Sequence, residues 1–346
     1  MEILRIPIRD RSAWTVADLE RDRSWDATLG AREIAELDAA IAGVESRGQP
    51  LLEITRNDFP LPTLAARLSA IPHELEHGLG FAVLRGLPVE RYTMEQARIA
   101  IWGMGTYMGT AISQNARGER LCSVTDQGRE YGATGRGYQT NDRLDFHCDN
   151  ADVVALLFVR KAQEGGLSLL TSAVSIYNEI LAKHPEQLAR LYRGFHYDLR
   201  GEGRPGVGPH TGHRIPVYSY LGSKLSCRYI RNGIELGAVS SGNPLTPEDV
   251  ELLDLIDRIA RRPEFCFITD FNPGDMQIVN NHATMHARTD YIDYPEPERK
   301  RHALRLWLNL VNGRPLAEEF SNRYGPNSGR LGVPPVERPP AHIAAS

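Results

Sequence analysis

Cysteine is scarce in this chain. The 346 residues include four, Cys122, Cys148, Cys227 and Cys266, which are far apart and form no C-x-x-C pair. So few cysteines exclude a disulfide framework and are typical of a protein from a reducing compartment. We therefore expect a cytoplasmic protein.

Long apolar runs and basic blocks are also missing. No segment approaches the roughly 20 apolar residues of a membrane-spanning helix, and residues 1–11 lack the apolar stretch of a secretory signal. With 40 Lys and Arg against 44 Asp and Glu, the net charge is −4. This balance argues against nucleic acid or an anionic membrane as the partner. An apolar content of 41% and a charged content of 24% are those of a globular chain.

The first third of the chain favours helices. Apolar residues recur at helical spacing in segments 31–45, 60–76 and 93–108, and Thr93 is a good N-cap for the last of them. Between the second and third helices, residues 80–86 form a short apolar run between two glycines. Such a run predicts a buried strand.

The second half favours strands. Short apolar runs are separated by Gly, Pro and Asn, and two helical segments, 172–192 and 246–261, interrupt them. Thr246 is expected to be the N-cap of the second segment. The predicted strands are 153–159, 167–170, 215–220, 225–230, 265–268, 276–279 and 304–311. This pattern predicts a mainly β fold with flanking helices, as a barrel or a double sheet. Residues 115–150 are polar and aperiodic, which indicates a functional loop, and the Pro- and Gly-rich part after Gly313 indicates a poorly packed extension.

One motif suggests a zinc metalloprotease. His73-Glu74-Leu75-Glu76-His77 matches H-E-x-x-H, in which two histidines four apart share a zinc ion and the glutamate acts as base. Glu76 would however place a charge at a helix that must line a buried site, and Val83 stands where a third histidine would fall. The simpler interpretation is a solvated helix end.

A second set of residues suits a different metal. His147 and Asp149 form an H-x-D, whose two side chains lie on the same side of an extended segment. His286 lies far along the chain in His-Ala-Arg-Thr, with His282 as an alternative ligand nearby. Two imidazoles and one carboxylate make the facial triad of non-haem Fe(II) oxygenases. Cys148, between the first two ligands, would point away from the ion.

Further motifs accompany this set. Gly165-Gly166-Leu167-Ser168 opens a strand with a hydroxyl group, and Arg301 and Arg305 lie four apart, on one face of another strand. A guanidinium group can bind a carboxylate through two parallel hydrogen bonds. In this order, the motifs resemble those of the taurine dioxygenase (TauD/TfdA) and clavaminate synthase-like superfamily of Fe(II)- and 2-oxoglutarate-dependent oxygenases. The resemblance spans about residues 78–312.

The resemblance implies a fold, a reaction and a site. The fold would be a double-stranded β-helix (jelly roll) over residues 78–312, with a helical extension at 1–77 and a tail at 313–346. The cofactors would be Fe(II), 2-oxoglutarate and O₂, and the reaction would hydroxylate an unactivated C–H bond with release of succinate and CO₂. Because Asp149 is present, halogenation is not expected.

The resemblance also assigns roles to individual residues. His147, Asp149 and His286 would bind iron, and Arg301 with Ser168 would bind 2-oxoglutarate, while Arg305 would contact either 2-oxoglutarate or the substrate. We expect the loop 115–143 to cover the iron, with substrate contacts from Gln139 and Asn141.

Three functions stay open at this point: the dioxygenase, the zinc metalloprotease, and a metal-binding β-sandwich without turnover. For the dioxygenase we expect a small-molecule substrate, with a carboxylate or an amino-acid-derived metabolite as the first class to test. The sequence leaves the oligomeric state open, including a homo-oligomer, and it does not separate hydroxylation from desaturation or cyclisation.

Overall fold

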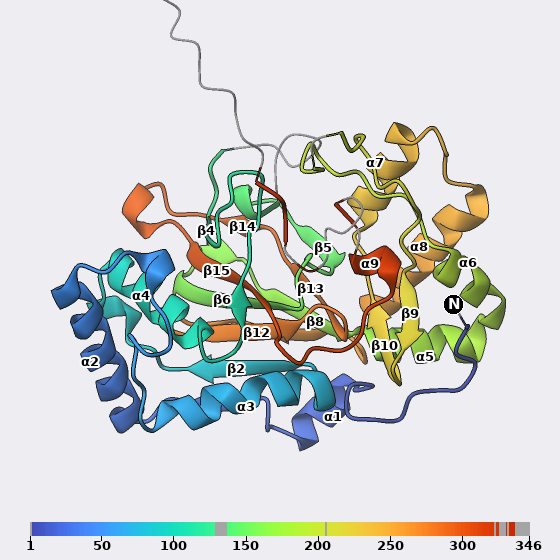
Figure 1. The fold of residues 1–346 in the computed structure, drawn as a ribbon. Coiled ribbons are helices and arrows are strands. Elements are labelled where there is room, and N and C mark those ends of the chain that lie inside the picture. Colours follow the sequence, from blue (N-terminus) through green and yellow to red (C-terminus); the bar gives the residue numbers. More distant parts are fainter. Residues whose placement is uncertain are drawn as a thin grey trace, which may run out of the picture.

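The computed structural model describes residues 2–128, 137–204, 206–321, 323–324, 330 and 332–335. No helix among these residues is long and apolar enough to cross a membrane. Two β-sheets face each other, and helices cover the outer side of each sheet (Figure 1).

The larger sheet has seven strands. Their order is β1-β2-β12-β6-β15-β3, and β4 also pairs with β15. The bounds are β1 (Asp26–Thr28), β2 (Phe81–Arg85), β3 (Thr110–Ala111), β4 (Leu121–Val124), β6 (Val153–Arg160), β12 (Met276–Asn280) and β15 (His302–Asn309). The two central strands, β6 and β15, run antiparallel, with Leu308 opposite Val153 and His302 opposite Arg160.

The smaller sheet has four strands in the order β11-β8-β13-β5. Its bounds are β5 (Leu144–His147), β8 (Ser168–Ser172), β11 (Phe267–Thr269) and β13 (Thr284–Arg288). Two short hairpins complete the strands: β9 (Tyr218–Leu221) with β10 (Lys224–Cys227), and β7 (Glu164–Gly165) with β14 (Tyr291–Ile292). Apart from the parallel pair β1 and β2, the strands of both facing sheets run antiparallel, which confirms the predicted double-stranded β-helix.

Side-chain alternation along β6 explains how the larger sheet packs on both faces, against the N-terminal helices and against the smaller sheet. Val153, Ala155 and Leu157 pack outward against the N-terminal helices, whereas Val154 and Phe158 pack inward, between the two sheets. The outer helices are α2 (Ala31–Arg47), α3 (Leu64–His77) and α4 (Met94–Gly105), with α1 (Val16–Arg21) and the single turns Leu51–Glu53 and Val89–Arg91 nearby in the chain. An apolar residue is therefore required at every position of β6 before its last residue, Arg160.

The smaller sheet is covered by the other helices. Further single turns are Gly137–Gln139, Pro185–Gln187 and Pro297–Arg299. The helices on the smaller sheet are α5 (Ala173–Lys183), α6 (Leu188–Arg193), α7 (Arg231–Ser240) and α8 (Pro247–Ala260), with α9 (Glu318–Ser321) from the C-terminal part. They share a core with Phe146, Cys148 and Met285. Cys148 is fully buried there, which confirms that it faces away from the proposed ion.

The predicted elements were correct in type more often than in extent. Thr93 and Thr246 cap α4 and α8 as expected, but the predicted helix 172–192 is two helices, interrupted before Pro185. The expected strands 215–220 and 225–230 shrink to β9 and β10, and α7 was not predicted. β4 and β5 lie within the stretch that we took for a loop without strands.

The part after Gly313 is better packed than predicted. Arg314 is buried and its Nε donates to the buried Glu76 at 2.8 Å, while Phe320 and Tyr324 are also buried. The expectation of a poorly packed extension is therefore wrong for the described residues of this segment. Buried aromatic and ion-paired side chains fix it to the body of the protein.

Candidate functional site: a metal centre between two sheets

Pairing of β5 with β13 brings two histidines together. His147, the last residue of β5, lies directly opposite His286 in β13, and their ring centroids are 4.4 Å apart. Asp149 follows two residues later, with Oδ1 3.9 Å from Nε2 of His147 and Oδ2 3.7 Å from Nε2 of His286. One ligand atom from each residue lies within 4.8 Å of the other two, and no other His, Cys, Asp and Glu cluster of this kind occurs in the described part of the chain.

The histidine rings are prepared to bind a cation. The backbone carbonyl of Asp145 accepts a hydrogen bond from Nδ1 of His147 at 2.8 Å. Nδ1 therefore carries the proton, and the lone pair of Nε2 points toward Asp149. Burial, helped by the neighbouring His147, lowers the pKa of His286 to about 3, so that ring is neutral at physiological pH.

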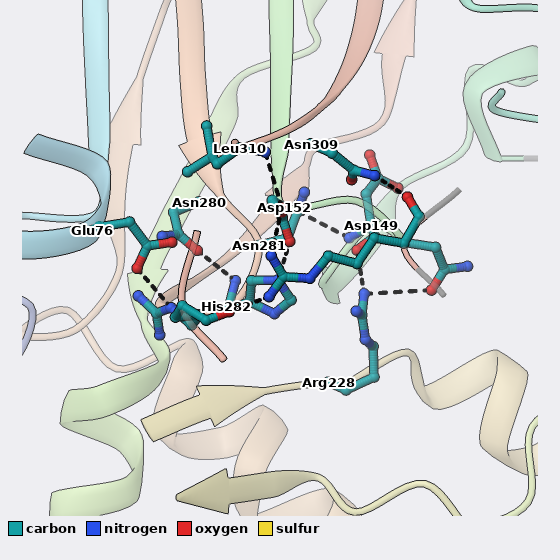
Figure 2. Close-up of polar contacts among 12 residues, drawn as sticks. Glu76, Asp149, Asp152, Arg228, Asn280, Asn281, His282, Asn309 and Leu310 are labelled. Carbon is teal, nitrogen blue, oxygen red and sulfur yellow. Dashed lines mark hydrogen bonds and ion pairs between the residues drawn. The ribbon is translucent and has the colours of Figure 1, made fainter. Parts of the chain in front are cut away.

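Asp149 is held at its main chain and at its side chain. Its N–H donates to Oδ1 of Asn281 at 3.0 Å, and its carbonyl accepts from Nη1 of Arg228 at 2.6 Å. Figure 2 shows Arg228 reaching this loop from one side and Asn281 from the other. At the carboxylate, Nε1 of Trp307 donates to Oδ2 at 2.9 Å. This fixes the direction of the carboxylate before any metal binds.

Asp149 is ionised despite its burial. Burial by itself raises the pKa of this carboxyl group, but its surroundings outweigh burial and hold the pKa below its usual range, above all Arg305, whose Nη1 lies 3.6 Å from Oδ2. An anionic carboxylate and two neutral imidazoles are the donor set of a divalent iron site.

His282 is not a ligand. It is fully buried, and its Nε2 lies 3.0 Å from Oδ1 of Asp152, whose Oδ2 accepts from the N–H of Leu310 (Figure 2). These contacts tie the turn before β13 to the end of β15. Of the two candidate histidines, geometry therefore places only His286 at the cluster.

Arg301 directly precedes β15, and Ser168 is the first residue of β8. Arg301 is buried, its guanidinium carbon is 5.6 Å from the ring centroid of Phe158, and its Nη1 has no hydrogen-bond partner in the described residues. A Cβ on Gly166 would lie 3.1 Å from Nε of Arg301. Gly166, at φ +70°, therefore leaves room for the arginine. Burial lowers the pKa of Arg301, so this cation gains from binding an anion.

Arg305 is engaged differently. Its Nε donates to Oε1 of Gln114 at 2.8 Å, and its guanidinium carbon lies over the rings of Tyr138 and Trp307 at 4.6 and 4.9 Å. With Asp149 also close, Arg305 already has partners on several sides. It adjoins the metal ligands, whereas Arg301 is set back from them.

A cavity of about 300 Å³ joins these groups between the two sheets. The metal cluster, Ser168, Arg301 and Arg305 all line it. Gln139 and Asn141 do not. Gln139 is buried and donates to Gln127, while Asn141 donates from Nδ2 to the carbonyl of Tyr291. The prediction that these two contact substrate therefore finds no support in the described residues, and Tyr138 lines the cavity instead; residues 129–136 of the predicted covering loop lie outside them.

Sequence reasoning missed several residues of the cavity. Arg288, in the His-Ala-Arg-Thr motif, lines it opposite Ser168 in the β13–β8 register, and its Nη2 donates to the carbonyl of Thr140 at 2.9 Å. Trp307 could have been found by strand alternation, because it lies two residues after Arg305. Asp198, Glu202 and Arg323 also line the cavity, and no local pattern in the sequence marks them.

The H-E-x-x-H motif forms no metal site. The side chain of His73 is 73% exposed, and Glu74 pairs with Arg11 at 3.2 Å. Glu76, taken above as part of a solvated helix end, is buried against Arg314. No third ligand joins His73 and His77 within the part of the chain that the structure describes.

Comparison with known proteins agrees with the cluster. Residues 47–307 match the family model "Taurine catabolism dioxygenase TauD, TfdA family". The chain belongs to this family. It is 36% identical to FR-33289 synthase of Streptomyces rubellomurinus over 331 residues, which cover 94% of this chain and 97% of that protein. It is 26% identical to the taurine hydroxylase-like protein SAT17 of Stachybotrys chartarum, over 86% of this chain and 79% of that one.

Solved structures show the same fold at low sequence identity. Asparagine oxygenase, in complex with Fe(II), a hydroxyasparagine and succinate, is 18% identical with a TM-score of 0.65, over 82% of this TauD/TfdA family chain and 93% of that one. The non-haem iron oxygenase OrfP, in complex with iron and α-ketoglutaric acid, is 12% identical with a TM-score of 0.59. The match covers 82% of this chain and 94% of that one. Membership of the family confirms the oxygenase prediction over the protease and over a β-sandwich without turnover.

The residues present fit both Fe(II) and 2-oxoglutarate. The cluster offers three donors of the right kind, and orienting hydrogen bonds hold two of them. Arg301 supplies a buried cation to the same cavity, and its Nη1 has no hydrogen-bond partner among the described residues. The protein is thus an Fe(II)- and 2-oxoglutarate-dependent oxygenase of this family.

Proposed function

We propose that this enzyme hydroxylates an unactivated C–H bond of a small carboxylate or amino-acid-derived metabolite. The observation that supports the proposal is a single cavity lined by the His147, Asp149 and His286 cluster and by Arg301, whose Nη1 has no hydrogen-bond partner among the described residues. A volume of about 300 Å³ suits a small metabolite together with 2-oxoglutarate.

The residues of the site have separate parts in the proposed reaction. His147, Asp149 and His286 hold the iron, and Arg301 with Ser168 holds the far carboxylate of 2-oxoglutarate. Trp307 and Asn281 keep Asp149 in place, and Arg305 keeps it ionised. The chemistry supplied by bound Fe(II), 2-oxoglutarate and O₂ is the decarboxylation of 2-oxoglutarate to succinate and CO₂, with one oxygen atom entering the substrate as a hydroxyl group.

Apolar side chains of the protein exclude water from the cavity. The inner wall of the cavity carries Leu156, Phe158 and Trp307, which place apolar surface beside the reacting groups. Apolar walls keep the carboxylate and guanidinium interactions strong, because little water competes for them.

The test is a substrate screen with the purified enzyme, Fe(II), ascorbate, 2-oxoglutarate and O₂. Mass spectrometry would follow a gain of one oxygen atom in the substrate together with one succinate for each product. Loss of two hydrogens instead of a gain of oxygen would replace hydroxylation by desaturation or cyclisation. Absence of succinate under all conditions would contradict the proposal.

A further inference from the structure

Arg323 is a buried cation on the wall of the active cavity. It lies beyond the residues that match the family model, two residues after α9, and its exposed fraction is 9%. It lines the same cavity as the iron ligands. Its Nε and Nη1 are buried and have no hydrogen-bond partner in the described part of the chain.

The surroundings of Arg323 do not balance its charge. Its guanidinium carbon lies 4.8 Å from the ring centroid of Tyr197 and 5.8 Å from that of Tyr324. Burial lowers its pKa, and Arg228 and Arg200 lower it further. No carboxylate among the described residues forms an ion pair with it. A buried cation of this kind is costly unless an anion joins it.

Arg323 is fixed to the iron-binding loop. Nδ2 of Asn150, the residue after Asp149, donates to the hydroxyl of Tyr324 at 2.8 Å. The guanidinium carbon of Arg228, which donates to the carbonyl of Asp149 (Figure 2), lies 5.5 Å from the ring centroid of Phe320 in α9. The segment that carries Arg323 is therefore held at two points against residues 149–150.

This position is distinct from that of Arg301. Arg301 precedes β15, whereas Trp307, six residues later, contacts Asp149. Six residues of strand span roughly 20 Å at about 3.3 Å each. Arg288 belongs to the Arg301 end, because burial lowers the pKa of Arg288 and the nearby guanidinium group of Arg301 lowers it further. The cavity thus has one cationic end near Arg301 and another near Arg323.

The two carboxylates of 2-oxoglutarate leave the cationic end near Arg323 without an anion. 2-Oxoglutarate has two carboxylates, of which one belongs at the iron and the other at Arg301. Two other arginines of the cavity wall are already engaged: Arg231 with Asp254 and Asp257 at 2.7 Å, and Arg200 with Asn232. We propose that Arg323 binds an oxyanion group of the prime substrate, such as a carboxylate, sulfonate or phosphonate group, and that the enzyme therefore selects acidic substrates. This inference rests on the proposed function, because it presumes that 2-oxoglutarate occupies the Arg301 end.

The first test measures binding of a bare oxyanion. Inorganic sulfate would be titrated into the Fe(II)-loaded enzyme at saturating 2-oxoglutarate without O₂, at constant ionic strength with chloride as the balancing salt. Thermal unfolding reports the binding. We expect saturable stabilisation of the wild type by sulfate, and at least 10-fold weaker apparent affinity in Arg323→Gln.

Arg200→Gln is the matched control. It removes one positive charge from the wall of the same cavity, at a side chain that already has a partner. Its sulfate affinity should stay within about twofold of the wild type. Equal losses in the two variants, or no loss in Arg323→Gln, would overturn the assignment.

A second readout separates binding from a structural role. Removal of an uncompensated buried charge should leave the melting temperature of the enzyme without sulfate unchanged or raise it, whereas loss of a structural arginine lowers it by several degrees. A marked fall of the melting temperature in Arg323→Gln would therefore count against the proposal.

In the substrate screen, a free acid should be oxidised at least 10-fold more efficiently than its neutral amide.

The two proposals can fail separately. Wild-type enzyme that forms no succinate from 2-oxoglutarate would contradict the proposed function. Wild-type enzyme that forms succinate, but whose sulfate affinity is the same in Arg323→Gln, would contradict only the role of Arg323.

Discussion

Two pairs of histidines lie at nearly the same spacing in this protein. The ring centroids of His73 and His77 are 4.6 Å apart, and those of His147 and His286 are 4.4 Å apart. The first pair sits at the exposed end of α3, one turn apart. The second joins two strands 139 residues apart in sequence, and its side chains are 22% and 11% exposed.

The difference lies in what surrounds each pair. His147 and His286 share a carboxylate that Trp307 and Asn281 orient, and His147 has its proton fixed by a carbonyl oxygen. His77 faces Lys224 instead, with Nζ 3.3 Å from its Nδ1. A cation beside an imidazole repels a second cation. Ring spacing alone therefore does not make a metal site, and a third anionic ligand with orienting hydrogen bonds does.

The largest effect should come from Asp149→Ala. This change removes the only carboxylate of the cluster, so iron affinity should fall more than the roughly 10- to 100-fold typical of losing an orienting neighbour, and coupled turnover should disappear. Iron content by elemental analysis, together with succinate formation, checks this. Retained oxidation of the substrate by this variant would contradict the ligand assignment.

Arg301→Gln should give the next largest effect. Loss of a charged, desolvated contact typically costs on the order of 2–5 kcal/mol, or roughly 30-fold to several thousand-fold in affinity. We expect that loss in the apparent affinity for 2-oxoglutarate, measured by titration with succinate as the readout.

Arg305→Gln is the comparison for this experiment. Because Arg305 is engaged by Gln114 and adjoins Asp149, its loss should act on the prime substrate and on the metal ligand more than on 2-oxoglutarate. If Arg305→Gln weakens 2-oxoglutarate binding more than Arg301→Gln does, the two roles are exchanged.

Trp307→Phe should have a smaller effect. It keeps an aromatic ring in place but removes the N–H that orients Asp149, and loss of such a partner typically weakens metal binding about 10-fold. Trp102→Phe is its control, because Nε1 of Trp102 donates to the carbonyl of Ile54, in the N-terminal helical layer. Competition with a chelator of known iron affinity measures the iron affinity of both variants. Equal iron affinity in the two would contradict the role of Trp307 in orienting Asp149.

The smallest effect should come from His73→Ala and His77→Ala. Both side chains are exposed and share no carboxylate ligand, so iron content and succinate formation should match the wild type. Zinc and iron content would be measured side by side. Metal loss in either variant would revive the protease interpretation.

Local signals were enough for much of the fold. Thr93 and Thr246 marked helix starts because capping depends on a few adjacent residues. The pairing of Glu76 with Arg314 could not be foreseen, since 238 residues separate the partners. For the same reason the segment after Gly313 was judged by its Pro and Gly content, although buried side chains such as Phe320 fix it in place.

The residues of the site also fall into those that local sequence signals predict and those that depend on distant segments. His147, Asp149 and His286 stand in short motifs, so the sequence alone predicts each of them as a ligand. Arg323 and Glu202 stand in no motif and reach the cavity only through the packing of distant segments. Gln139 and Asn141 were chosen for their place in a polar loop, but side-chain direction within an irregular loop is not encoded by spacing. Tyr138, their neighbour, lines the cavity instead.

The pairing of His147 with His286 across β5 and β13 also bears on how the enzyme acquires its metal. During synthesis, the ribosome releases His147 and Asp149 long before His286, so an emerging chain can offer the ion only two of its three ligands. β13 must also pair with β8 before His286 is in position. Iron should therefore enter a polypeptide that is already complete, through the mouth of the cavity, and loading should be a step after folding.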